Sequence, residues 1–368
     1  MKRYKLLNNV LGWVVFVIAA VTYILTLEST ASFWDCGEFI ASGYKLEVGH
    51  PPGNPIFMLT ARFFANFASS PSEVAYMVNL MSGLLSAATI LLLFWTITRL
   101  AQKIVLRDGE TEETMSLGQM IAILGCGLVG ALAYAWSDTF WFSAVEGEVY
   151  AYSSFCTALV FWLILKWESV ADLPHANRYI ILIAYIIGVS IAVHLLNLLC
   201  IPAIVLVYYY RKYKNTDLKG SLIALLVSFV LIVLLLYGLV PGFVEVASWV
   251  ELLFVNVFHL PFNSGVVFYF FLIVGVIAWA IYETYAQRSD KLIKISFLIS
   301  IVLVGIPFIG DGYIIGIVLT AALAYYLFTR KKLAVVAMNT ILLSLFVIFI
   351  GYSSYALIVI RSTANNPM

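Results

Sequence analysis

The sequence predicts an all-α polytopic membrane protein with about eleven transmembrane helices. Of the 368 residues, 63% are hydrophobic and only 11% are charged, whereas about a quarter of the residues in soluble domains carry charge. Aromatic residues make up 15%, which suits a chain that places Trp and Tyr at bilayer interfaces. A net charge of +1 offers no basic surface for nucleic acid.

Apolar runs of about 20 residues, the length that crosses a bilayer, recur between short charged breaks. The first follows Met-Lys-Arg-Tyr-Lys, but it is too long for a signal peptide and no small-residue cleavage site follows it, so we expect it to remain as a helix. The predicted spans lie near residues 10–27, 76–99, 119–137, 149–167, 179–193, 197–210, 219–238, 266–285, 293–309, 313–329 and 333–354.

The basic residues predict the orientation. With the N-terminus in the cytoplasm, all but three of the 21 Lys and Arg residues fall on cytoplasmic segments, as the positive-inside rule requires. The stretch 55–70 is also apolar, but a crossing there would invert every later loop and place Arg62 at mid-membrane. We therefore expect an interfacial helix on the outer leaflet.

This topology gives one transmembrane domain over residues 1–354, with outer loops at 28–75, 138–149 and 239–265. The last of these has no basic residue and is apolar enough to lie in the interface, either as a lid or by amphipathic packing. Three of the four cysteines lie within apolar runs and only Cys36 lies in a connecting segment, which excludes a disulfide scaffold.

The first motif, Ser32-Phe33-Trp34-Asp35-Cys36-Gly37-Glu38-Phe39, follows the first span. A helical turn would place the carboxylates of Asp35 and Glu38 on one face. Carboxylates near a low-dielectric surface have raised pKa values and can serve as a base and its orienting partner. The alternative is that Asp35 only caps the helix that carries Glu38.

The second motif is Gly49-His50-Pro51-Pro52-Gly53-Asn54-Pro55. Its prolines and glycines predict a rigid turn with His50 at its head. The alternative is a loop that only delivers the chain onto the interfacial helix.

The third motif surrounds Glu146, Glu148 and Tyr150 in the second outer loop. The two glutamates share a face if the backbone is extended, whereas Glu146 and Tyr150 share one if it is helical. No Lys or Arg lies nearby in the sequence to neutralise them. These residues are candidates for binding the substrates, and the alternative is a solvated loop with an aromatic belt.

The fourth motif contains His194 and Asn197, where one predicted span ends on the outer side and the next begins. One helical turn separates the two residues, so both side chains could face the same cavity as the acids. Equally, His194 could be a satisfied residue at a helix end.

Lys45, Arg62 and Arg361 are the only cations predicted on the outer face. Arg forms paired hydrogen bonds with phosphate, so these residues are candidates for binding a lipid phosphate at headgroup level. The alternative for each is an anchor that extends its charge to the interface.

The acid pair, the His-Pro-Pro turn and the interfacial helix together resemble the C-type (GT-C) glycosyltransferases of the protein O-mannosyltransferase group. The longer strings Trp34-Asp35-Cys36-Gly37-Glu38-Phe39 and Gly49-His50-Pro51-Pro52-Gly53 resemble a bacterial branch of polytopic proteins related to animal protein O-mannosyltransferases. Two departures stand out, since Cys-Gly separates the acids and Gly53 replaces the usual Leu.

The resemblance implies an inverting transfer of mannose or a similar hexose from a polyprenyl-phosphate donor to a hydroxyl acceptor, a protein Ser or Thr, at the extracytoplasmic face of the inner membrane. Asp35 would be the base, Glu38 and His50 would orient it, and Arg62 and Arg361 would bind phosphate. The absence of a GxGxxG, P-loop, zinc or nucleophile-elbow motif agrees with a lipid-borne donor. The family pattern requires no metal or other cofactor, and we assign none.

The resemblance also implies that residues 355–368 begin an extracytoplasmic segment of a longer protein. Two other functions stay open from the sequence. A transporter or flippase would need ionisable groups at mid-bilayer and, commonly, inverted repeats, and neither is evident. An assembly scaffold would tolerate joint replacement of Asp35 and Glu38.

Overall fold

The computed structural model describes residues 2–107, 109–310 and 313–362, and in these residues it contains helices and turns but no strand. The predicted all-α polytopic membrane fold is confirmed. The stretches of the described residues that are long and apolar enough to cross a bilayer number 8: Arg3–Leu25, Pro71–Val105, Leu117–Ala135, Val149–Val170, Leu195–Lys212, Leu218–Val257, Ser264–Ala286 and Val335–Ser362.

Each of these stretches covers a predicted span. Shorter helices occupy the other three predicted spans, namely α8 (Arg178–Ile191), α13 (Asp290–Leu303) and α14 (Tyr313–Thr329). The chain is therefore an integral multi-pass membrane protein, and it divides into two compact units.

Unit 1 comprises residues 1–179, 183–200 and 348–368, of which 1, 108 and 363–368 lie outside the described residues. The predicted extracytoplasmic segment 355–368 is thus described only to residue 362, and most of that part is helical. The helices of unit 1 are α1 (Lys2–Leu25), α2 (Cys36–Lys45), α3 (Pro55–Ala65), α4 (Val74–Val105), α5 (Leu117–Ala135), α6 (Asp138–Ala144), α7 (Val149–Val170), most of α8, the 3₁₀ turn Leu195–Cys200 and α16 (Ala356–Ser362).

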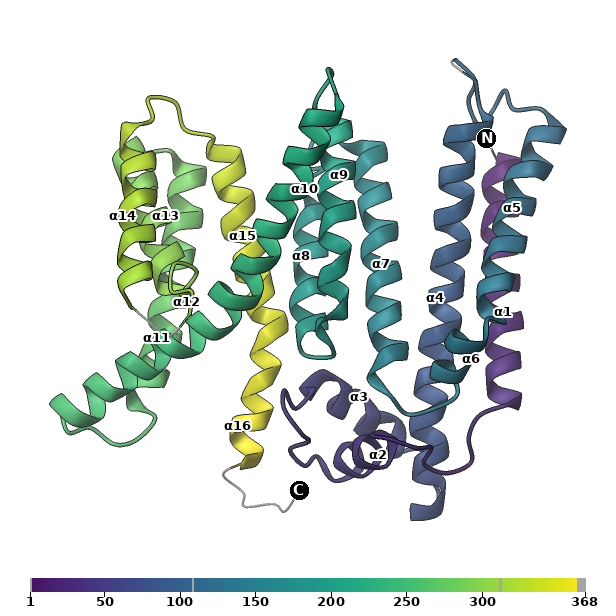
Figure 1. The fold of residues 1–368 in the computed structure, drawn as a ribbon, viewed down its shortest axis with the longest axis horizontal. Helices are drawn as coiled ribbons and strands as arrows, with labels where there is room; N and C mark the ends of the chain where they lie inside the picture. The colour runs from purple at the N-terminus through teal and green to yellow at the C-terminus, as the bar shows by residue number, and fades with distance from the viewer. Residues whose placement is uncertain (1, 108, 311–312, 363–368) are drawn as a thin grey trace. The chain divides into compact units, whose positions relative to one another are not determined.

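The long helix α4 is the centre of unit 1 and packs against α1, α5 and α7 (Figure 1). Its residues Ala87, Ile90 and Phe94 are buried in a core that also contains Val15 of α1 and Ile123 of α5. The two short helices α2 and α3 pack against each other and against the N-terminal part of α4. With 11 residues, α3 is roughly 16 Å long, about half the hydrocarbon thickness. The interfacial placement of residues 55–70 stays a prediction.

Unit 2 comprises residues 180–182 and 201–347. A π-helical turn, Leu234–Leu239, joins α10 and α11, and a second one, Leu253–Val257, follows α11. Residues 239–257, predicted as part of an outer loop, are therefore helical. The helices of unit 2 are α9 (Ile201–Lys212), α10 (Leu218–Val233), α11 (Val240–Leu252), α12 (Ser264–Ala286), α13, α14 and most of α15 (Val335–Tyr352).

Candidate active site

One apolar core brings the four sequence motifs together. Phe39 lies in it beside Phe57, the two rings 5.2 Å apart between centroids. Val149, which directly follows Glu148, and Val193, which directly precedes His194, are buried in the same core. Four segments far apart in the sequence therefore meet beside the N-terminal ends of α4 and α7.

Asp35 is the N-cap residue of α2, but its side chain makes no capping hydrogen bond. The residue is exposed. Capping, the alternative role for this carboxylate, is thus not what the side chain does. Its oxygens remain accessible at the start of α2.

Glu38, in the first turn of α2, holds the His-Pro-Pro turn. One carboxylate oxygen accepts the backbone N–H of His50 at 2.6 Å and the other lies 3.0 Å from His50 Nδ1. Gly49 permits this approach, because a Cβ atom there would lie 3.3 Å from Glu38 Oε1 and 3.1 Å from Met58 Cε. Glu38 therefore contacts the first residue of the His-Pro-Pro turn directly.

The charges of this pair reinforce each other. The hydrogen bond to Glu38 raises the pKa of His50 above its usual range. Partial burial works to raise the pKa of Glu38, but the hydrogen bonds from the His50 backbone and ring outweigh it and lower that pKa. One ligand atom each from Asp35, Glu38 and His50 lies within 4.8 Å of the others. A cation would fit this spacing, yet Glu38 and His50 already satisfy each other.

Glu146 and Glu148 are both buried, each 5% exposed. Glu146 accepts hydrogen bonds from Cys36, at 3.5 Å, and from Ser32, which ties the second loop to the first. Burial raises the pKa of Glu146. In the described part of the chain, neither glutamate forms an ion pair with Lys or Arg.

Glu148 is the N-cap of α7 in extended conformation, and its carboxylate accepts the N–H of Val149 at 3.0 Å. Burial raises its pKa to about 7; the hydrogen bond from Val149 opposes this shift, and the charges of Glu146 and Asp35 add to it. We name Asp35, Glu38, His50, Glu146 and Glu148 the carboxylate cluster.

Tyr150 and His194 lie next to each other, with ring centroids 5.5 Å apart. Nδ1 of His194 accepts the N–H of Leu196 at 3.2 Å, so this His closes the start of a 3₁₀ turn, as its structural alternative proposed. Burial lowers the pKa of His194. Asn197 is buried and accepts a weak hydrogen bond from Cys200. No contact among the described residues joins Asn197 to the carboxylate cluster.

The three cations Lys45, Arg62 and Arg361 meet at the C-terminal end of α2. Arg62 donates to the carbonyl of Tyr44, and Arg361 donates to the carbonyls of Leu46 at 2.5 Å and Lys45 at 3.3 Å. Both guanidinium groups thus cap this helix end, where cations are favoured. Because α2 has 10 residues, the cations gather roughly 15 Å along its axis from Asp35.

The turn after His50 explains why glycine replaces leucine at residue 53. Gly53 has a φ of +88°, and a Cβ atom there would lie 2.6 Å from Ile358 of α16. Pro51 and Pro52 are exposed, whereas Asn54 is buried. The backbone N–H of Ile56 then donates to the carbonyl of Ala192 at 3.1 Å, which fixes the turn beside the fourth motif.

Sequence reasoning missed two residues that shape the site. Cys36 is fully buried, and burial raises the pKa of its thiol, so it stays protonated and donates to Glu146. Asn79 of α4 donates to the carbonyls of Glu28 and Thr30 at 2.8 and 3.1 Å, which secures the start of the first loop. A polar Asn inside an apolar run was the available signal.

Residues 35–217 match the family model of the protein O-mannosyl-transferase TMEM260 N-terminal domain. The chain belongs to a protein O-mannosyltransferase-like family. The match includes every member of the carboxylate cluster, Arg62 and His194, and it excludes Arg361.

Two relatives carry the same name. A protein O-mannosyl-transferase TMEM260 of Mus musculus is 27% identical over 209 residues, which cover 57% of this chain and 27% of the mouse protein. A protein O-mannosyl-transferase tmem260 of Dictyostelium discoideum is 23% identical over 189 residues, 50% of this chain and 20% of that protein. The chain therefore matches only about a quarter of its relatives' length. No solved structure matches it.

Proposed function

We propose that the chain is an inverting GT-C-type glycosyltransferase that moves mannose or a similar hexose from a polyprenyl-phosphate donor to a hydroxyl acceptor, a protein Ser or Thr, at the extracytoplasmic face. One observation carries this proposal: the carboxylate cluster assembles from two distant loops inside the segment that matches an O-mannosyl-transferase domain. Buried carboxylates without a cation are unfavourable unless a function retains them.

Asp35 is the general base in this proposal. It accepts the proton of the acceptor hydroxyl as that oxygen attacks the anomeric carbon of the sugar. The bond between this carbon and the phosphate oxygen breaks on the opposite side, and the lipid phosphate leaves with the bonding electrons. Asp35 suits the role because it is exposed and makes no capping hydrogen bond.

The other acids position Asp35 and the substrates. Glu38 and His50, joined by two contacts, fix α2 against the His-Pro-Pro turn. Glu148 has a pKa of about 7, so near neutrality it can donate a hydrogen bond to a sugar or acceptor hydroxyl or accept one. Glu146, Tyr150, His194 and Asn197 complete the proposed donor and acceptor surface.

Lys45, Arg62 and Arg361 form the proposed phosphate site. Their shared place at one end of α2 supports this, because clustered Lys and Arg side chains bind phosphate.

Sugar transfer by the Asp35→Asn variant in proteoliposomes tests the proposal. With polyprenyl-phosphate mannose as donor and a Ser/Thr-rich peptide as acceptor, we expect transfer to fall by about 10²- to 10⁴-fold, the usual contribution of a general base. Asp138→Asn, which changes an exposed acid of the second loop outside the cluster, is the matched control and should retain activity.

Wild-type turnover by Asp35→Asn would overturn the assignment of the base. Movement of labelled donor across the vesicle membrane by the wild-type chain, without a covalent product, would instead indicate a flippase.

A further inference from the structure

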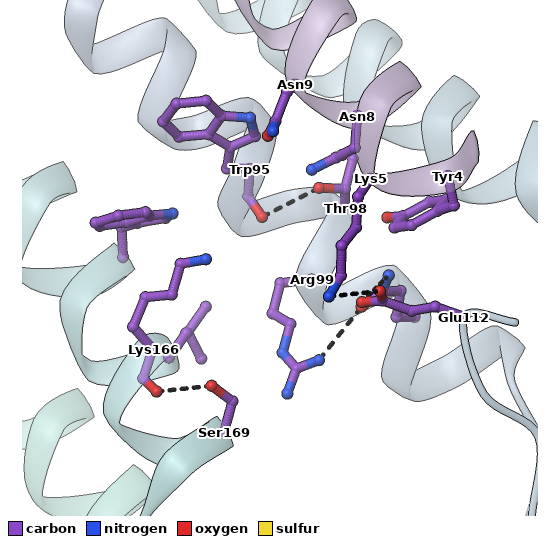
Figure 2. Close-up of a pocket in the computed structure, with 13 residues that line it drawn as sticks. Tyr4, Lys5, Asn8, Asn9, Trp95, Thr98, Arg99, Glu112, Lys166 and Ser169 are labelled. Carbon is purple, nitrogen blue, oxygen red and sulfur yellow. Dashed lines mark hydrogen bonds and ion pairs between the residues drawn. The ribbon is translucent and has the colours of Figure 1, made fainter. Parts of the chain in front are cut away.

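A second polar site lies in unit 1 at the opposite end of α4 and α7. It is a cavity of about 480 Å³ between α1, α4 and α7 (Figure 2). Its lining includes Lys5 of α1, Arg99 of α4 and Lys166 of α7. About 20 residues of α4 separate Arg99 from Asn79, which contacts the start of the first loop, so roughly 30 Å of α4 lie between this cavity and that loop. The proposed transfer reaction does not use it.

The lining is cationic on balance, with Lys5, Arg99 and Lys166 facing one acid, Glu112. Lys5 lies 3.7 Å from Glu112. Lys166 lies over the ring of Trp162, 4.9 Å from its centroid, and has no carboxylate partner in the described part of the chain. Positive charge is therefore in excess inside a partly enclosed space.

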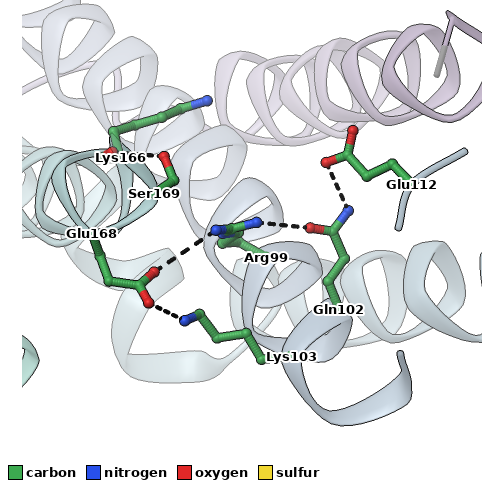
Figure 3. Close-up of polar contacts among 7 residues, drawn as sticks. All are labelled: Arg99, Gln102, Lys103, Glu112, Lys166, Glu168 and Ser169. Carbon is green, nitrogen blue, oxygen red and sulfur yellow. Dashed lines mark hydrogen bonds and ion pairs between the residues drawn. The ribbon is translucent and has the colours of Figure 1, made fainter. Parts of the chain in front are cut away.

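Arg99 is held in place by its neighbours (Figure 3). It donates to Gln102 at 3.3 Å and lies 3.8 Å from Glu168, which also pairs with Lys103. Gln102 in turn donates to Glu112 at 3.4 Å. This network joins the ends of α4 and α7 to the loop after α4, so the cavity has a fixed wall.

Two buried polar atoms of lining residues have no hydrogen-bond partner, Asn8 Oδ1 and Trp95 Nε1. Buried polar groups are normally paired, so these two atoms are unsatisfied polar groups in the wall of the cavity.

An apolar groove begins where the polar cavity ends. It has a volume of about 450 Å³ and runs along α1 past Asn9, Val10, Trp13, Val14, Val17 and Ile18. Asn9 lines both the cavity and the groove. Trp13 of the groove and Trp95 of the cavity meet edge to face, 6.4 Å apart between ring centroids. The polar, cationic cavity therefore adjoins an open apolar surface on one side of α1.

We propose that this composite site binds a membrane phospholipid with a net anionic headgroup. The phosphate lies in the cavity among Lys5, Arg99 and Lys166, and one acyl chain follows the groove on α1. Charge complementarity selects the anion, and the continuous apolar groove selects a lipid over a free phosphate ester.

Native mass spectrometry of the purified full chain tests the site. The chain is incubated with dioleoyl-phosphatidylglycerol or dioleoyl-phosphatidylcholine, and bound lipid is quantified. We expect phosphatidylglycerol to be retained in clear excess. Each cation near an anionic lipid contributes about a fivefold change in affinity, so Lys166→Gln should weaken retention about fivefold and Lys5→Gln/Lys166→Gln about 25-fold.

Arg107→Gln is the matched control, because Arg107 is an exposed cation of the loop after α4 and does not line the cavity. It should change retention by less than about twofold. An equal loss in Arg107→Gln and Lys166→Gln, or equal retention of both lipids, would overturn the proposal. Displacement of phosphatidylglycerol by millimolar glycerol phosphate would also overturn it, since that result requires no groove.

Discussion

The acids at the two ends of α4 and α7 differ in their partners. At the basic end, Glu168 has two cationic partners, Arg99 and Lys103, and Glu112 contacts Lys5. At the other end, Glu146 and Glu148 are each only 5% exposed and have no Lys or Arg partner in the described residues. At one end of these helices, the acids are therefore paired with cations. At the other end, the acids have no cationic partner among the described residues.

We infer that the paired acids stabilise the fold, whereas the acids without a cationic partner take part in the reaction. An ion pair keeps a carboxylate charged and inert at neutral pH, whereas burial without a cation brings its pKa toward the working range of an acid or base. Glu148, with a pKa of about 7, is the clearest example. The predictions below test this contrast.

Among the variants that test this contrast, Glu148→Gln should have the largest effect, with transfer reduced by about a hundredfold. The variant should lose activity without losing stability above pH 7. Because the pKa of Glu148 rises from 4.5 to about 7 on folding, the fold binds the proton more tightly, and wild-type stability falls as pH increases across this interval. Above pH 7 the Gln variant, which resembles the protonated acid, should be at least as stable as the wild type.

Tryptophan-detected thermal unfolding at pH 5 and pH 8, beside the transfer assay, measures both effects. Glu73→Gln, an exposed acid of the first loop, is the control and should preserve the wild-type change with pH. If the stability of Glu148→Gln changes with pH as that of the wild type does, burial does not raise the pKa of Glu148.

A smaller effect is expected from Gly53→Ala, which changes the geometry of the site without changing its charge. The positive φ and the contact with Ile358 both oppose a side chain at this position. We expect a loss of about 1–3 kcal/mol in unfolding free energy. Gly37→Ala is the control, because a Cβ atom there meets only Ala31 at 3.9 Å. Equal melting temperatures for both variants would show that the turn accommodates a side chain.

Glu38→Gln should reduce transfer about tenfold, because it weakens the link between α2 and the His50 turn. The pKa of Glu38 is lowered and that of His50 is raised, so the pair stabilises the fold above the ordinary pKa of Glu38, 4.5, and loses this effect as pH rises through the raised pKa of His50. The difference in melting temperature between wild type and Glu38→Gln should therefore be larger at pH 6 than at pH 9.

The double variant Glu38→Gln/His50→Gln separates a pair from two independent residues. Residues that act through each other give non-additive losses. We expect the double variant to transfer sugar about as fast as Glu38→Gln alone. Multiplied losses would mean that each residue contacts the substrate by itself.

The sequence predicted the spans and the motif segments because both depend on local signals. Runs of apolar residues give the helices, and Gly, Pro and isolated acids in apolar surroundings stand out by composition. What it could not predict is which distant groups pair. The contact of Cys36 with Glu146 joins residues 110 positions apart, and the capping of α2 by Arg361 joins residues 315 positions apart. Such contacts depend on the tertiary packing of distant segments, which a local sequence pattern does not specify.

Lys103→Gln should have the smallest effect and tests the other side of the contrast. Lys103 is partly exposed, and Glu168 keeps Arg99 as a second partner, so we expect a loss below about 1 kcal/mol in unfolding free energy. At 1 M salt, where the Debye length is about 3 Å, the difference should vanish. A loss of unfolding free energy comparable to that of Gly53→Ala, and unchanged by salt, would show that Glu168 behaves as a buried charge. The acids at the two ends of α4 and α7 would then not differ in the way we infer.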